Sequence, residues 1–226
     1  MLFCRLGTVD YAEAHRVQQE LQAKRISGDI EDTVLLLEHP PVFTLGRSAK
    51  QQHLLAPTEA LEARGFSVYE VGRGGDITYH GPGQLVAYPI VDLKPERKDV
   101  RKYVWSLEET MIRTCADLGL AAQRIHGLNG AWIEERKVGA VGVRISRWVT
   151  MHGLALNAST NLSHFDLIVP CGIEDKAVTS LSAELGRDIG AADIAEPLAA
   201  HFASLYDADI EWRDALPGGV SVSRSI

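Results

Sequence analysis

Three cysteines are the side chains of this 226-residue sequence that could act as soft nucleophiles. Cys115 follows the apolar spacing of a predicted helix and Cys4 begins a predicted strand, so we interpret both as buried structural thiols. Cys171 lies between Pro170 and Gly172, in a predicted loop outside any regular apolar pattern, which makes it the candidate reactive thiol; a structural role is the alternative. The odd number and wide spacing of the cysteines argue against a disulfide framework and against a thiolate zinc site.

A reactive thiol must be ionised, because the thiolate and not the thiol is the nucleophile. A free thiol has a pKa of about 8.5, and a cation beside the sulfur lowers that pKa. From the residues alone, Lys137, which follows Glu134, Glu135 and Arg136, is most simply interpreted as part of a solvated turn.

Residues 73–84 (RGGDITYHGPGQ) form the most unusual stretch of the sequence. Gly74 and Gly75 permit backbone dihedrals and close approaches that a Cβ atom would block. Thr78 and His80 alternate around Tyr79, so in an extended chain they point to the same side. The pattern predicts a polar pair beside a tight turn, and the alternative is a turn-rich hairpin with one hydrogen-bonded histidine.

Two common nucleotide-binding motifs are missing from the sequence. A dinucleotide fingerprint that starts at Gly72 would need a glycine where Ile77 stands. No Gly-x-x-x-x-Gly-Lys-Ser/Thr phosphate loop occurs either. A group-transfer reaction without an ATP site would need a substrate that is already activated.

The elements that must position these residues follow from the apolar patterns. Helical spacing predicts helices over residues 10–24, 58–64, 99–118 and 191–206. Apolar and β-branched runs predict strands over residues 33–37, 42–45, 67–71, 84–91, 131–134, 138–146, 148–157 and 210–213. Hairpins and helices are mixed rather than alternating, which predicts an α+β fold: a single domain with a mixed, mostly antiparallel β-sheet packed by helices. We place this domain over residues 1–215, followed by a flexible C-terminal tail over 216–226, which is rich in turn residues.

The composition narrows the class of protein. A formal charge of −7 favours solubility and argues against a nucleic-acid partner, which would favour a basic domain. No apolar run approaches the roughly 20 residues that a membrane helix needs, and the first ten residues lack the apolar core of a signal peptide. We therefore expect a cytoplasmic protein without a membrane partner, in a reducing compartment.

The run from Arg73 to Tyr88 (RGGDITYHGPGQLVAY) resembles the signature of the lipoyl(octanoyl) transferase family, within the biotin/lipoate protein ligase superfamily. Residues 130–146, 151–157 and 168–172 are similar to three further blocks of that family, and the resemblance covers roughly residues 8–205. It implies a biotin/lipoate protein ligase-like fold. It also implies the activity of an octanoyl-[acyl-carrier-protein]:protein N-octanoyltransferase, an acyltransferase that carries out the first step of protein lipoylation.

The resemblance also assigns roles to residues. It implies that Cys171 carries the octanoyl group as a thioester and that Lys137 is its catalytic partner, with no metal and no cofactor. The implied substrate-binding residues are Arg73, Gly74, Gly75, Asp76, Ile77, Thr78, Tyr79, His80, Ala140, Val141, Gly142, His152, Gly153, Leu154 and Ala155. We interpret the two histidines of this set as groups that position the substrate.

The implied partners are octanoyl-acyl carrier protein as donor, and as acceptors the lipoyl domains of 2-oxoacid dehydrogenase E2 subunits and the glycine cleavage H protein. Docking of an acidic carrier would need a basic patch, either residues 94–102 or Arg144 with Arg147. The alternatives are an ATP-dependent lipoate or octanoate protein ligase, an amidotransferase between lipoyl proteins, a thioester hydrolase that pairs Cys171 with His80 or His152, and a non-catalytic acyl-binding module.

Overall fold

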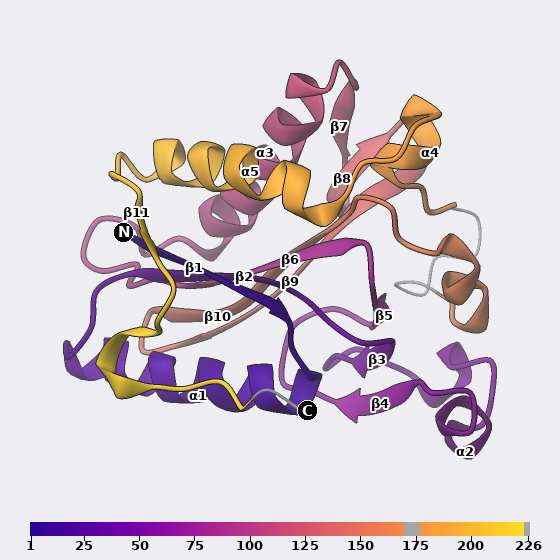
Figure 1. Cartoon of the computed structure of the whole chain (residues 1–226), viewed down its shortest axis with the longest axis horizontal. Helices are drawn as coiled ribbons and strands as arrows, with labels where there is room; N and C mark the ends of the chain where they lie inside the picture. Colours follow the sequence, from indigo (N-terminus) through magenta and orange to yellow (C-terminus); the bar gives the residue numbers. More distant parts are fainter. Residues whose placement is uncertain (170–176, 224–226) are drawn as a thin grey trace.

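Apolar and β-branched runs build a large sheet through the centre of the molecule (Figure 1). The computed structural model describes residues 1–169 and 177–223. In spatial order the strands are β11 (Glu211–Arg213), β1 (Leu2–Thr8), β2 (Thr33–Glu38), β6 (Gln84–Ile90), β10 (Val149–Asn157), β9 (Arg136–Ser146), β8 (Leu128–Ile133) and β7 (Ala122–Ile125). Only the pairs β11–β1 and β1–β2 are parallel among these strands. The predicted mixed, mostly antiparallel sheet is confirmed.

Helices cover both faces of this sheet (Figure 1). On one face, α1 (Tyr11–Ser27) buries Ala14, Val17 and Leu21 against β6 and β10. On the other face lie α3 (Val100–Asp117) and α5 (Ala191–Leu205), which pack on each other and on the sheet. The short helix α4 (Leu181–Leu185) precedes α5. The sheet is thus buried from both sides.

A smaller sheet stands beside the large one and holds the glycine-rich stretch. It consists of β4 (Ser67–Glu70), β3 (Val42–Leu45) and β5 (Ile77–His80), in that order. The short helices η1 (Gln51–His53), α2 (Thr58–Glu62) and η2 (Leu162–Leu167) surround it. Its core is aromatic and includes Phe43, Phe66, Tyr79 and Phe165. This core fixes β5, and with it the polar residues of the glycine-rich stretch.

The structure differs from the sequence-based expectation in a few elements. Strands β5 and β7 and helix α4 were not predicted, because their short segments stand beside glycines or turn residues that mask the strand and helix signals. β5 exists because it pairs with β3, in register with Val42 opposite His80. The segment predicted to be a tail from residue 216 packs on α1 as far as it is described. Leu216 and Val220 are buried there around η4 (Pro217–Gly219).

Candidate active site

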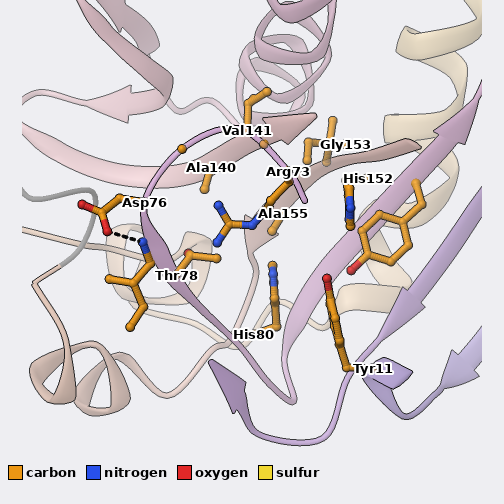
Figure 2. A pocket seen from close by; sticks show the side chains of 15 residues that line it. Tyr11, Arg73, Asp76, Thr78, His80, Ala140, Val141, His152, Gly153 and Ala155 are labelled. Carbon is orange, nitrogen blue, oxygen red and sulfur yellow. Dashed lines mark hydrogen bonds between the residues drawn. The ribbon is translucent and has the colours of Figure 1, made fainter. Parts of the chain in front are cut away.

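A pocket opens between the glycine-rich stretch and the hairpin of β9 and β10 (Figure 2). We call it the main pocket. It is lined by Tyr11, Arg73, Gly75, Asp76, Ile77, Thr78, His80, Tyr88, Ala140, Val141, Gly142, His152, Gly153, Leu154 and Ala155. The structure therefore brings together residues from three distant parts of the sequence, as the family resemblance implies.

Two of the predicted substrate-binding residues, Gly74 and Tyr79, do not line this pocket. The N–H of Gly74 donates a hydrogen bond to the carbonyl of Val143 at 2.9 Å, which docks the loop onto β9. Tyr79 points to the opposite face of β5 from Thr78 and His80, since side chains alternate along a strand. Its ring is fully buried in the aromatic core, and its hydroxyl is 2.7 Å from Nδ1 of His164. In this position the ring supports β5, and a substrate-binding role for Tyr79 stays a prediction.

Glycine is required where the loop meets the sheet. Gly75 has a φ of +87°, a left-handed conformation that costs glycine little. At Gly142 a Cβ atom would lie 2.9 Å from Cδ of Arg73, so the loop could not approach β9 as closely. Arg73 itself is buried and donates from Nη2 to the carbonyl and the hydroxyl of Thr44, at 2.6 and 2.9 Å. The guanidinium thereby ties the loop to the small sheet.

A chain of hydrogen bonds fixes the tautomer of His80. The carbonyl of Thr179 can only accept, so Asn157 donates to it from Nδ2 at 2.9 Å and presents Oδ1 to Gln84. Gln84 donates from Nε2 to Asn157 at 2.9 Å and to the carbonyl of Tyr79 at 3.2 Å. Its Oε1 must then accept from Nδ1 of His80, at 2.7 Å. His80 consequently keeps its proton on Nδ1, and its Nε2 offers a lone pair to the main pocket.

The histidines around the main pocket are held neutral. Burial lowers the pKa of His80 to about 3, and the neighbouring His39 and Arg73 disfavour its protonation further. Burial likewise lowers the pKa of His152 to about 3, assisted by His15 and Arg73. The pocket therefore combines neutral histidines with the guanidinium of Arg73 and with apolar strand residues such as Val141 and Leu154, which can contact an alkyl chain.

Lys137 lies beside the main pocket rather than in a solvated turn. Its side chain is 9% exposed and lines a second pocket, which we call the lysine pocket, with Thr78, Gln84, Gly139, Ala140, Ala155, Asn157, Phe165 and Val178. Thr78, Ala140 and Ala155 line both pockets, so the two adjoin. The ammonium stands 4.7 Å from the ring centroid of Trp132. The Lys137 side chain thus lies beside one end of the main pocket.

The backbone of Lys137 pairs with the chain that follows residue 176. Its N–H donates to the carbonyl of Ala177, and its carbonyl accepts from the N–H of Thr179, both at 2.9 Å. Cys171, the predicted nucleophile, lies outside the described residues. Only a short stretch of sequence separates Cys171 from Ala177. Contact between the side chains of Cys171 and Lys137 is consistent with this spacing and stays a prediction.

The other two cysteines are poor nucleophiles. Both are fully buried. Burial raises the pKa of the Cys4 thiol to about 11 and that of the Cys115 thiol to about 12. Neither forms a thiolate near neutral pH. The expectation that both are structural agrees with this environment.

Sequence reasoning missed two pocket residues and part of the hydrogen-bond chain. Tyr11 begins α1 and reaches the pocket because this helix packs against the sheet, and Tyr88 lines the pocket from β6. Gln84 belongs to the glycine-rich signature, so its position in the sequence could have indicated a role in the site. Asn157 ends β10 and carried no such signal.

Comparison with known proteins identifies the family. The lipoyl protein ligase A/B catalytic domain family matches residues 10–203. The chain belongs to this family. It is 49% identical to an octanoyltransferase of Solibacter usitatus, over 95% of this chain and 94% of that protein. It is also 48% identical to an octanoyltransferase of Chloroflexus aggregans, over 89% and 93%. The predicted resemblance to the lipoyl(octanoyl) transferases is confirmed.

Solved structures confirm the fold. A lipoate-protein ligase A bound with ATP superposes with a TM-score of 0.73 at 15% identity, over 95% of this chain and 89% of that one. A biotin protein ligase from Aquifex aeolicus in complex with biotin and ATP gives a TM-score of 0.58 at 16% identity, over 91% and 70%. The predicted biotin/lipoate protein ligase-like fold is correct.

Proposed function

We propose that this protein transfers an octanoyl group from a carrier-bound thioester to a lysine of a lipoyl-accepting protein. The observation that carries the proposal is the position of Lys137: its side chain lines the lysine pocket, which adjoins the main pocket, and its backbone is hydrogen-bonded to Ala177 and Thr179. The octanoyltransferase names of relatives at 46–49% identity support the acyl group and the reaction.

In the first half-reaction, Lys137 as ammonium stabilises the thiolate of Cys171. The thiolate attacks the thioester carbon of the donor, a bond forms between Cys171 sulfur and the acyl carbon, and the bond to the carrier sulfur breaks. The departing carrier thiolate takes a proton from Lys137. The protein then holds octanoyl as a thioester, with Lys137 neutral.

In the second half-reaction, the amine of the acceptor lysine attacks the acyl carbon. Neutral Lys137 accepts the proton of that amine, the Cys171 thiolate leaves, and the ammonium–thiolate pair is restored. Protons and electron pairs balance without ATP, because an amide is more stable than the thioester it replaces. The reaction needs no metal, and no cluster of metal-ligating side chains occurs among residues 1–169 and 177–223.

For the donor we propose an acyl carrier protein, and for the acceptors lipoyl domains of 2-oxoacid dehydrogenase E2 subunits and the glycine cleavage H protein. Of the two basic groups in the sequence, Arg144 with Arg147 is the better docking candidate. Arg144 lies next to Gly72, and its charge contributes to the lowered pKa of the pocket residue His152. Arg97, from the other group, instead donates to the carbonyl of Tyr206 at 2.8 Å and stacks on its ring.

We place the protein in the cytoplasm. Two thiols that remain free in the structure, Cys4 and Cys115, suit a reducing compartment. Within the described part of the chain, no helix has both the length and the apolar character needed to cross a membrane.

The main alternatives make different products. An ATP-dependent ligase would acylate the acceptor from free octanoate and ATP, and a cysteine hydrolase would release octanoate without an acceptor. Three solved lipoate or biotin protein ligases resemble this chain at only 15–16% identity, which shows a shared fold alone.

The test compares wild-type protein with Cys171→Ala and Lys137→Met. Octanoyl carrier protein and a lipoyl domain are mixed with each protein, and acylated domain is measured by mass spectrometry. We expect transfer by wild type, with a loss of at least about a hundredfold in both variants, the scale of removing a nucleophile or general base. Full activity of Cys171→Ala, or product from ATP and free octanoate alone, contradicts the proposal.

A further inference from the structure

Buried polar side chains close the main pocket at the end away from Lys137. Tyr11 and His152 line the pocket there, and Gln18, which does not line it, is hydrogen-bonded to the backbone of His152. Tyr11, Gln18 and His152 are 4%, 0% and 2% exposed, and we call these three residues the polar floor. Figure 2 shows Tyr11 and His152 on one side of the pocket, with Thr78 and Ala140, which also line the lysine pocket, on the other. The lysine pocket thus adjoins the main pocket at one end, and neutral polar side chains stand at the other end.

The polar floor differs from the other polar walls because its hydrogen-bonding groups are unmatched. Tyr11 Oη, Gln18 Nε2 and His152 Nε2 find no partner within residues 1–169 and 177–223. By contrast, the hydroxyl of Tyr88 donates to Nε2 of His39 at 2.8 Å. Contact between methylene groups and polar atoms that lack a hydrogen-bond partner is unfavourable, because those atoms lose water and gain no hydrogen bond. The polar floor is therefore a poor surface for an alkyl chain.

Strand geometry gives the length of β10 between the lysine pocket and the polar floor. Ala155 lines both pockets and His152 is three residues earlier on β10. At about 3.4 Å per residue, this stretch measures roughly 10 Å. An extended chain of bonds advances roughly 3.3–3.6 Å for every three bonds, so the seven bonds from the acyl carbon to the last methyl of octanoyl cover roughly 8 Å. A decanoyl chain would reach the polar floor.

The polar floor is held in place by α1. His152 has a φ of +60°, a left-handed conformation rarely adopted by a residue with a side chain. Its N–H donates to Oε1 of Gln18 at 2.8 Å, and its ring stacks on that of His15, with centroids 5.7 Å apart. A side chain in an unusual backbone conformation, fixed from a neighbouring helix, forms a rigid stop rather than an adaptable surface.

We propose that Tyr11, Gln18 and His152 act as a chain-length stop, which admits an eight-carbon acyl group and rejects longer ones. The inference rests on octanoyl transfer as the function. It places the thioester end of the chain in the lysine pocket and the terminal methyl just short of the polar floor.

The test measures kcat/KM for hexanoyl, octanoyl, decanoyl and dodecanoyl carrier protein in four proteins. These are wild type, His152→Gly, Gln18→Ala and the control Gln22→Ala. Glycine tolerates the left-handed backbone at position 152, so that variant removes the side chain without new strain. Gln22 is also a buried glutamine of α1 that bonds to β10, but it does so through the carbonyl of Val149 at 2.9 Å, whereas Gln18 bonds to the N–H of His152.

We expect wild type to prefer octanoyl. The ratio of decanoyl to octanoyl kcat/KM should rise roughly tenfold or more in His152→Gly and Gln18→Ala, since two buried methylenes are worth about that factor. Gln22→Ala should keep the wild-type ratio. An unchanged ratio in both floor variants overturns the chain-length stop while leaving octanoyl transfer intact. Wild-type protein that transfers no acyl chain at all overturns the proposed function instead.

Discussion

Replacing Gln84 with alanine tests the hydrogen-bond chain that fixes His80. The amide of Gln84 is buried and makes three bonds, to the carbonyl of Tyr79, to Oδ1 of Asn157 and to Nδ1 of His80. Each buried partner left unsatisfied costs about 1–3 kcal/mol, and a water molecule in the vacated space can restore part of this. We expect Gln84→Ala to lower the free energy of unfolding by about 3–5 kcal/mol.

The matched control is Gln22→Ala. Gln22 donates one bond, to the carbonyl of Val149, so its loss should cost about 1–2 kcal/mol. Urea unfolding of the two variants and of wild type gives the comparison. Gln84→Ala should also reduce transfer activity, since His80 is no longer held with its Nε2 lone pair toward the pocket. A cost for Gln84→Ala no larger than that for Gln22→Ala would refute the three-bond reasoning.

Three further predictions concern pH, the loop and docking. Folded-state pKa values near 3 for His80 and His152 and about 4 for His39 lie below the unfolded value of 6.5. As the pH falls, these histidines therefore bind protons in the unfolded chain before they do so in the folded protein. Below about pH 6.5 the free energy of unfolding should drop by about 1.4 kcal/mol per pH unit per histidine. Urea titrations that find no loss of stability between neutral and mildly acidic pH contradict this. Gly142→Ala should push the Arg73 loop off β9 and raise KM for octanoyl carrier protein more than it lowers kcat, as steady-state kinetics can show. Arg144→Glu should raise KM for the carrier several-fold at low salt and less at high salt, whereas equal KM values at both salt concentrations would exclude electrostatic docking there.

The sequence predicted the large sheet and its helices well, because those elements carry their own apolar periodicity. α3 has a continuous stripe from Tyr103 through Leu107 and Met111 to Cys115, and it runs over Val100–Asp117, close to the predicted 99–118. β5 was missed because its register is set by β3, an interaction between segments far apart in sequence.

The candidate site was predictable only in part. Family resemblance supplied the residues of the glycine-rich stretch and of β9 and β10, and most of them line one pocket. Alternation along β5 explains why Tyr79 faces the aromatic core instead. Tyr11 and Gln18 could not be recognised from the sequence, since their role depends on how α1 lies against β10.

The central claim is that Cys171 carries the octanoyl group between donor and acceptor. The most direct test is the intact mass of the protein after it is mixed with octanoyl carrier protein, followed by peptide mapping of the modified residue. The account predicts a gain of one octanoyl group on Cys171 that disappears when a lipoyl domain is added and is missing in Cys171→Ala. A lipoyl domain that becomes octanoylated while Cys171 stays unmodified throughout, even in rapidly quenched samples, would contradict it.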